Sequence, residues 1–133
     1  DEMLAWPTLS ALIPPKLGHG YTDSLVFGKG RRGAYTLSQG ILGPAVLKTL
    51  GLVRYHLRQF AMLRAAGAES MSDRAVSAAT GMHVWTWRMK YKPVYASYTN
   101  ERIRMRLAVV ESAMAAARLG NPSGVLETVV AEW

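Results

Sequence analysis

The sequence predicts an all-α protein, a single helical bundle of about six to seven helices, two of which are long. Residues 44–66 carry apolar side chains at intervals of three and four, the spacing of one face of a helix, and residues 99–119 carry a second such series. The two series are Val46, Leu50, Val53, Leu57, Phe60 and Leu63, and then Ile103, Leu107, Val110 and Met114. No stretch alternates apolar and polar residues as a half-buried strand does.

Composition agrees with one compact domain. The chain has 133 residues, half of them hydrophobic, which suffices for a core. There is no cysteine, so disulfides and thiolate sites are excluded, and a reducing compartment is expected. Sixteen Lys and Arg residues against nine Asp and Glu residues give a net charge of +7. Such a charge favours a polyanion or an acidic protein surface as partner, or it is simply a solvated basic surface.

The first twenty residues are expected to form an extended segment that precedes the helical domain. Residues 1–20 contain three prolines and two glycines, so we expect an extended lead or linker there and a helical domain at 21–133. Asp1 and Glu2 stand where a signal peptide would be basic, and the absence of a starting Met suggests a processed product or a fragment. The best candidate for a membrane span, 41–53, is short and is interrupted by Lys48.

Two short helices precede the first long one. A helix at 21–27 would have Thr22 as its N-cap, and the glycines of 28–33 then interrupt the pattern. A second helix is expected at 34–41. Pro44 suits the first turn of the long helix, where its missing N–H would have no partner anyway.

The remaining helices are marked by their caps. Gly67 is expected to end the long helix, Ser72 to cap a helix at 73–80, and Gly81 to end that helix. Residues 84–92 have a helical period, and Pro93 should then break or kink the chain.

The last two helices follow after Pro93. Thr99 caps the second long helix and places Glu101 in its first turn. Ser123 is expected to cap a final short helix that runs through Val130.

The glycine-rich segment 28–33 has the pattern GxGxxG. A dinucleotide site needs this loop between a strand and a helix, with an acid about 20 residues further on. Here a short helix precedes the glycines, and residues 50–56 contain no acid. We therefore interpret the segment as a turn between helices, and an enzyme that uses this loop is the weakest alternative.

No other motif indicates catalysis or metal binding. His19, His56 and His83 have no second ligand at a metal-binding spacing, the nine acids are isolated, and no Gly-x-Ser-x-Gly elbow occurs. We predict no catalytic residue, no metal site and no cofactor for this chain.

Residues 73–92 have the outline of a helix-turn-helix. In that interpretation Arg88 and Lys92, one turn apart, would contact phosphates or base edges. Trp85 and Trp87 suit a core or an interface better than a recognition helix. More broadly, residues 85–106 interleave six basic residues with aromatic ones. These aromatics either stack on bases or fill the space between helices while the basic side chains extend over them; we favour the second.

The order of the segments resembles one protein family. Residues 21–60 (YTDSLVFGKGRRGAYTLSQGILGPAVLKTLGLVRYHLRQF) are similar to the C-terminal domain of the delta subunit of bacterial DNA polymerase III. In that family a short helix ends in Gly-Lys, a basic pair follows, and a long helix runs through a Leu-Arg pair, here Leu57-Arg58. The segments 83–89, 98–119 (YTNERIRMRLAVVESAMAAARL) and 124–130 (GVLETVV) resemble the helices that follow. The resemblance covers nearly everything after Gly20.

The resemblance implies a collar domain. In the family, five such helical domains, from delta, delta-prime and the ATP-hydrolysing subunits, form a ring that holds the clamp loader together. The loader places the sliding clamp on primed DNA during chromosome replication. This chain would then be a cytoplasmic, non-catalytic part of the polymerase III holoenzyme. Its partners would be the other loader subunits and, indirectly, primed DNA, with neither a membrane nor a small-molecule substrate.

The sequence offers a set of candidate residues for contact with partners or DNA. They are basic residues beside the apolar series, together with one tryptophan: Arg54, Arg58, Trp85, Arg88, Lys92, Arg102 and Arg106. The alternative function is that of a small basic helix-turn-helix DNA-binding protein that uses residues 73–92.

Overall fold

The computed structural model describes residues 17–28 and 30–133, and within them the protein is entirely helical, without a strand. Most of the predicted lead, residues 1–16, lies outside the described residues. The elements are a helix at 17–26, α2 (Arg31–Ser38), α3 (Gly43–Ala66), η1 (Ala68–Ser70), α4 (Asp73–Thr80), α5 (Val84–Thr86), η2 (Trp87–Tyr91), α6 (Lys92–Tyr95), α7 (Asn100–Arg118) and α8 (Val125–Glu132). The predicted all-α class with two long helices is confirmed.

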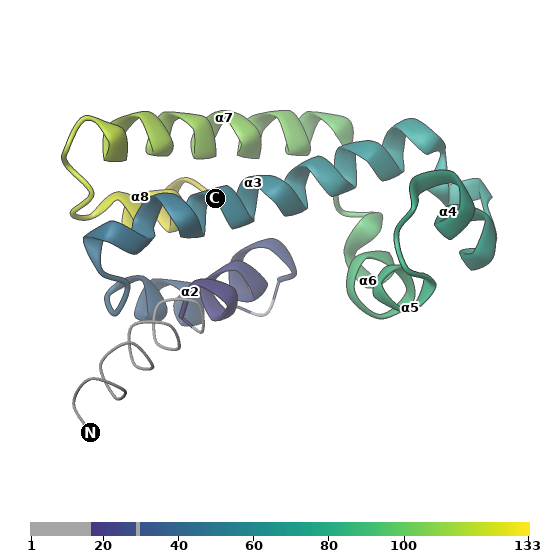
Figure 1. Ribbon diagram of the computed structural model, residues 1–133, viewed down its shortest axis with the longest axis horizontal. Coiled ribbons are helices and arrows are strands. Elements are labelled where there is room, and N and C mark those ends of the chain that lie inside the picture. Colours follow the sequence, from purple (N-terminus) through teal and green to yellow (C-terminus); the bar gives the residue numbers. More distant parts are fainter. Residues whose placement is uncertain (1–16, 29) are drawn as a thin grey trace, which may run out of the picture.

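The long helix α3 runs through the whole molecule (Figure 1). α7 lies antiparallel along it and makes its most extensive contact, and α8 folds back beside both. The helix at 17–26 and α2 lie on the other side of α3, while α4, α5 and α6 gather at its C-terminal end. We call this second group, residues 73–95, the α4–α6 lobe.

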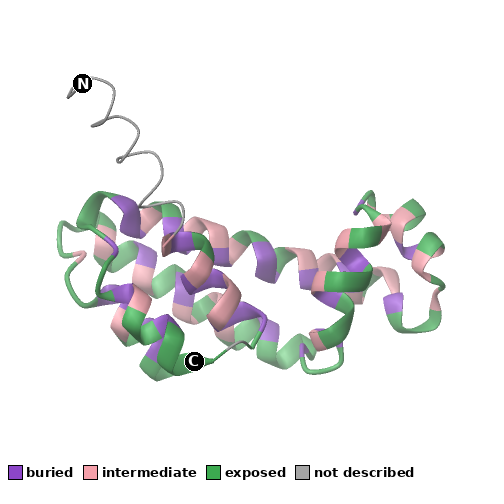
Figure 2. Cartoon of the chain, turned by 90° about the horizontal axis from the view of Figure 1, so that it is seen from below, coloured by how far each residue is buried: buried purple, intermediate pink, exposed green. Residues whose placement is uncertain are grey.

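The core follows the predicted apolar series. All six side chains of the α3 series are buried, and in the α7 series only Leu107 is partly exposed. Buried residues therefore line the facing sides of the helices and exposed residues the outer sides (Figure 2). Among the described residues, no helix combines the length and apolarity that crossing a bilayer requires.

Several helix ends are also as predicted. Gly67 and Gly81 end α3 and α4 in the left-handed conformation, with φ of 75° and 77°. The Ser72 hydroxyl accepts the N–H of Ala75, and the Thr99 hydroxyl accepts the N–H of Arg102. Local hydrogen bonding thus fixes where α4 and α7 begin.

The N-terminal region differs from the prediction. Residues 17–20 are helical, and Thr22 is not an N-cap, because its buried hydroxyl donates back to the Gly18 carbonyl within the helix. Gly18 serves close packing, since a Cβ there would lie 3.0 Å from Thr49 Oγ1 on α3. α2 begins at Arg31 instead of residue 34, because Gly28 and Gly30 alone supply the positive φ of the turn.

Pro93 does not end its helix, which is a second difference. The preceding five residues form a π-helical turn, in which the Lys92 N–H donates to the Trp87 carbonyl. This wider turn accommodates the proline ring, which in a regular α-helix would clash with the carbonyl four residues back. At the other end of the chain, Gly124 with φ of 74° stands at the N-cap position predicted for Ser123, and α8 extends to Glu132.

Five aromatic rings form the centre of the molecule. Phe60 of α3 stacks on Tyr98, with ring centroids 4.0 Å apart, and lies 4.9 Å from Tyr91 of η2. Phe27 meets Tyr91 and His56 edge-on, at 5.3 Å and 5.2 Å. His56 Nδ1 and the Tyr91 hydroxyl are hydrogen-bonded within this group. The cluster therefore joins three parts of the chain that are distant in sequence: the end of the first described helix, α3, and residues 91–98.

Polar contacts tie the same segments together. The Tyr98 hydroxyl donates to the Val26 carbonyl, and the Tyr21 hydroxyl donates to the Leu126 carbonyl at 2.8 Å. Arg64 donates to the carbonyls of Tyr95 and Tyr98, at 2.8 Å and 2.7 Å, and so holds the turn between α6 and α7 against α3.

Truncation of Phe60 should be among the most damaging single changes. Phe60→Ala removes a fully buried ring and leaves a cavity, so we expect the free energy of unfolding to fall by about 3–5 kcal/mol. Urea unfolding followed by circular dichroism measures this. Leu119→Ala, at a side chain that is 87% exposed, is the control and should change stability by less than about 0.5 kcal/mol. Equal effects of the two changes would contradict the central role of the ring.

His56 should make the fold sensitive to acid. Burial, together with the positive charge of Lys90, lowers the pKa of His56 to about 4. Between about pH 6.5 and 4 the unfolded chain binds a proton that the folded protein does not, so the free energy of unfolding should decrease as the pH falls, by roughly 3 kcal/mol in total. His56→Gln should show a flatter profile over this range in urea titrations. An unchanged profile in the variant would refute the assignment.

Candidate functional site

The structure distributes the seven predicted partner-facing residues over three places. Trp85, Arg88 and Lys92 lie in the α4–α6 lobe, and Arg54 and Arg58 lie along α3. Arg102 and Arg106 lie in the first half of α7. The seven residues therefore belong to three separate parts of the fold.

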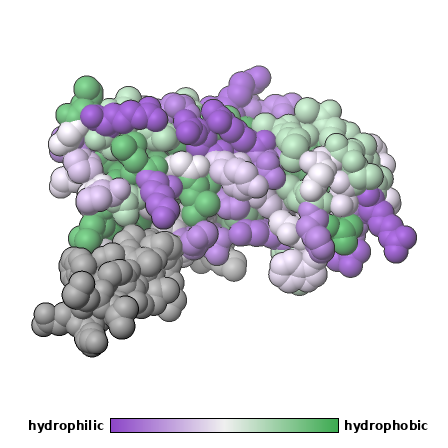
Figure 3. Space-filling view, in the orientation of Figure 1, coloured by the Kyte–Doolittle hydropathy of each residue, from purple (hydrophilic) through white to green (hydrophobic). Residues whose placement is uncertain are grey.

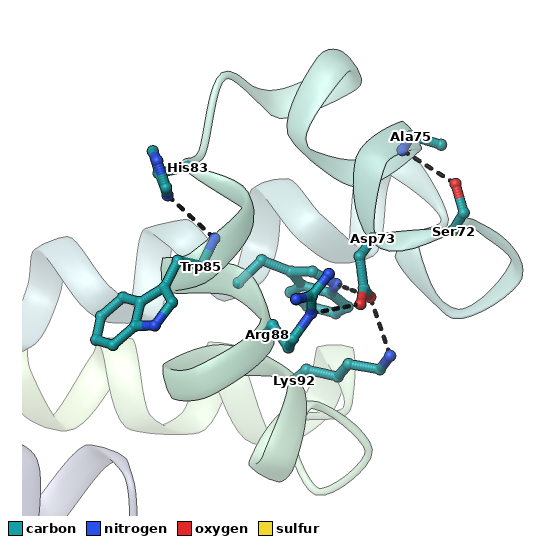
Figure 4. A network of polar contacts seen from close by, with 8 residues as sticks. Ser72, Asp73, Ala75, His83, Trp85, Arg88 and Lys92 are labelled. Atoms are coloured by element: carbon teal, nitrogen blue, oxygen red, sulfur yellow. Dashed lines mark hydrogen bonds and ion pairs between the residues drawn. The ribbon is translucent and has the colours of Figure 1, made fainter.

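Asp73 organises the α4–α6 lobe (Figure 4). It lies in the first turn of α4, next to the Ser72 cap. Its carboxylate accepts hydrogen bonds from Trp87 Nε1 at 2.8 Å, Arg88 Nε at 3.0 Å and Lys92 Nζ at 2.9 Å. Hydrogen bonds from Lys92, Trp87 and Arg88 lower the pKa of Asp73 to about 2. The carboxylate therefore stays charged and holds the following helix against α4.

The ion pairs with Asp73 limit how strongly Arg88 and Lys92 can attract a phosphate. Arg88 and Lys92, which the helix-turn-helix interpretation places against DNA phosphates, are both paired with the same carboxylate. Each keeps about half of its side chain exposed, so neither is inaccessible. Their charge is partly compensated inside the protein, which weakens the attraction of a phosphate.

Trp85 faces away from the Asp73 network. Its ring is 62% exposed, and Met89, one turn further along, is 58% exposed. Figure 4 shows the indole directed away from Asp73, while His83 Nδ1 accepts a hydrogen bond from the backbone N–H of Trp85. Trp87, in contrast, is buried. Trp85 and Met89, which we call the Trp85–Met89 patch, thus present a large apolar surface on a helix that Asp73 holds in place.

Arg54 and Arg58 differ in their environment. Arg54 forms an ion pair at 3.2 Å with Glu111, which joins α3 to α7. Arg58 is exposed on α3. Arg54 is thus partly committed to the bundle, and Arg58 contributes to the basic outer surface.

Arg106 is fixed by aromatic neighbours. Its Nη1 donates to the Tyr98 hydroxyl at 2.9 Å, and its guanidinium lies over the Trp133 ring, 4.6 Å from the centroid. Burial, followed by the nearby charges of Arg102 and Arg31, lowers its pKa. Arg102 is exposed on the preceding turn of α7.

Three important residues are missing from the sequence-based set. Asp73 has no motif beyond its place after an N-cap, and its partners lie more than a dozen residues away. Arg31 was part of the glycine-rich segment, but it donates to the carbonyls of Val130 and Ala131 at the end of α8. Trp133 donates to the Leu25 carbonyl at 2.9 Å. Only the tertiary structure brings these groups to their partners.

The glycine-rich segment and the histidines can now be placed in the structure. Gly28 and Gly30 form the turn between two helices, as predicted for the GxGxxG segment. Within residues 17–28 and 30–133, no three His, Asp or Glu side chains lie close enough together to hold a metal ion. The described residues present apolar and basic surfaces on a set of packed helices.

The chain matches no protein-family profile, no curated protein and no solved structure.

Removal of the Asp73 charge should loosen the lobe. Asp73→Asn is expected to lower the melting temperature by a few degrees at neutral pH, because three charged or polar donors lose their ionic acceptor. The stabilisation by Asp73 is present above its unfolded-state pKa of 3.8 and disappears as the pH falls towards about 2. The melting temperatures of parent and variant should therefore converge between about pH 4 and 2.

The matched control is Asp23→Asn. Asp23 has a single ion pair, with Lys90 at 3.6 Å, and exposed single pairs contribute little. Differential scanning calorimetry of both variants provides the comparison. If Asp23→Asn were the more destabilising change at neutral pH, the organising role of Asp73 would be wrong.

Proposed function

We propose that this chain is an oligomerisation module, the collar domain of a DNA polymerase III delta subunit, and that it has no catalytic activity of its own. It would help to assemble the clamp loader, which places the sliding clamp on primed DNA. The proposal combines the resemblance of residues 21–130 to this family with the surfaces described above.

The observation that carries the proposal is the Trp85–Met89 patch. Large apolar side chains that are mostly exposed are expected at protein–protein contacts, and tryptophan is the most enriched residue at their energetic centres. Asp73 restrains the helix that carries this patch, because it binds Trp87 and Arg88, between the two patch residues, and Lys92 after them. A tryptophan on a restrained helix loses less conformational freedom when a partner covers it than one on a mobile segment does.

Large apolar side chains are also exposed elsewhere on the bundle. They are Tyr35, Leu42, Tyr55, Met105 and Leu119. Figure 3 shows hydrophilic residues along the α7 edge and a more apolar area at the α4 end of the same face. Such a mixture suits a subunit that contacts neighbours on more than one side, as a member of a ring does.

The second function predicted from the sequence, DNA recognition through residues 73–92, has weaker support. The cations that it requires, Arg88 and Lys92, share Asp73 as a partner. Trp85 and Met89, two large apolar side chains, are also exposed on it. These features favour a protein partner for this lobe.

The test is assembly with the cognate delta-prime and ATPase subunits, measured by gel filtration with light scattering. The parent chain should enter a complex with them. The double variant Trp85→Ala/Met89→Ala should weaken that complex at least about tenfold, because the truncation removes the anchor of the contact. The control is Arg104→Ala, at an exposed residue of α7 that belongs neither to the patch nor to the other exposed apolar residues, and it should assemble normally.

Binding to duplex DNA, measured at several salt concentrations, tests the alternative function. A helix-turn-helix protein would bind it with a steep dependence on salt, and Arg88→Gln/Lys92→Gln would abolish that binding. The collar proposal fails if the chain does not join the loader subunits, or if the double variant assembles like the parent. It also fails if tight duplex binding depends on Arg88 and Lys92.

A further inference from the structure

A basic hollow lies beside the α4–α6 lobe, where the residues just before α2, the turn before α7 and the first half of α7 meet, and Val94 of α6 is part of its lining. Its volume is about 340 Å³, and its lining includes Gly30, Arg31, Ser97, Tyr98, Arg102 and Arg106. We call it the arginine pocket. The three arginines come from segments some 70 residues apart, so the pocket exists only in the folded protein.

Each of these guanidinium groups keeps unused donors. An arginine has five N–H donors. Arg31 uses its Nη2 for the carbonyls of Val130 and Ala131, and Arg106 uses its Nη1 for the Tyr98 hydroxyl. These bonds fix two of the guanidinium groups in position and leave their other N–H groups available. Arg102, which is exposed, adds a third guanidinium group to the lining.

Carboxylates do not neutralise this cluster. Among the ion pairs of the described residues, none involves Arg31, Arg102 or Arg106. Glu101 and Glu132 lie in the adjoining hollow that shares Arg102 and Arg106, but neither pairs with them. The mutual repulsion of the three charges contributes to the lowered pKa of Arg106. An anion between them would relieve that repulsion.

The start of α2 adds backbone donors to the same place. Gly30, the N-cap residue, provides no side-chain acceptor, and the first turn of α2 contains no acid. The first N–H groups of a helix have no partner within the helix, and they favour negative charge. Gly30 and Arg31, at this end of α2, both line the pocket.

We propose that the arginine pocket binds a phosphate group. Several guanidinium forks combined with backbone N–H donors match the oxygens of a phosphate, which accepts hydrogen bonds in several directions at once. The phosphate is either free in solution or part of a nucleic-acid backbone. The site is separate from the Trp85–Met89 patch, and the proposal does not rest on the assembly function.

The experiment is a titration of ¹⁵N-labelled protein at constant ionic strength, followed by NMR. One series uses inorganic phosphate, and a second uses a short single-stranded oligonucleotide. We expect saturable shifts of the backbone amides of Arg31 and Arg32 in at least one series. Arg102→Gln should weaken that binding at least about fivefold, since it removes a charged donor without breaking a hydrogen bond of its side chain within the protein.

The matched control is Arg104→Gln. It changes the charge equally on the same helix, but Arg104 does not line the pocket, so binding should change less than about twofold. Arg31→Gln provides a second variant on the opposite wall, with its fold checked by circular dichroism. Much tighter binding of the oligonucleotide, with the same amide shifts, identifies a nucleic-acid backbone as the ligand, whereas binding of inorganic phosphate with no gain for the oligonucleotide identifies free phosphate.

Two results would overturn the proposal. One is the absence of saturable shifts at the amides of Arg31 and Arg32 in both series. The other is an equal loss of binding in Arg102→Gln and Arg104→Gln, which would indicate attraction to general surface charge.

Discussion

The packing of Phe60 against its aromatic neighbours is the contact on which the rest of the structure depends. This ring is fully buried and touches Phe27, which follows the first described helix, and Tyr91 and Tyr98, which lie on either side of α6. Apolar burial supplies most of the stability of a small domain, and here much of it converges on one side chain of α3. The two halves of the bundle and the α4–α6 lobe therefore share a single centre.

This centre also determines where the functional surfaces lie. Tyr91, held between Phe27 and Phe60, fixes the π-helical turn, so that Trp87 reaches Asp73 while Trp85 remains outside. Tyr98, stacked on Phe60, offers its hydroxyl to Arg106. The apolar patch and the arginine pocket are thus placed by residues that belong to neither of them. Changes in the core can accordingly alter binding without touching a binding residue.

Local signals in the sequence were sufficient for the long helices and several of their ends. The apolar series of α3 repeats over five turns, and Ser72, Thr99 and Gly67 act within a few residues of their own positions. What could not be predicted depends on distant partners. Gly18 looks like a helix breaker until Thr49 packs against it, and Pro93 ends a helix unless the preceding turn widens.

The candidate sites also depend on partners that are distant in the sequence. Charge and aromaticity identified Trp85, Arg102 and Arg106, but nothing local indicates that Asp73 binds Arg88 and Lys92, or that Arg31 lies beside Arg106. The function itself rests on the resemblance and on exposed surface, which the helical frame alone does not define.

The bonds between the first described helix and α8 have a consequence for synthesis on the ribosome. Tyr21 donates to Leu126 and Trp133 donates to Leu25, across more than 100 residues in each case. A nascent chain that still lacks residues 124–133 leaves the Tyr21 hydroxyl, the Leu25 carbonyl and the apolar side of its first helix without these partners. Closure of the bundle must therefore wait until the last helix has left the exit tunnel, and the uncovered apolar surface is prone to aggregation during that interval.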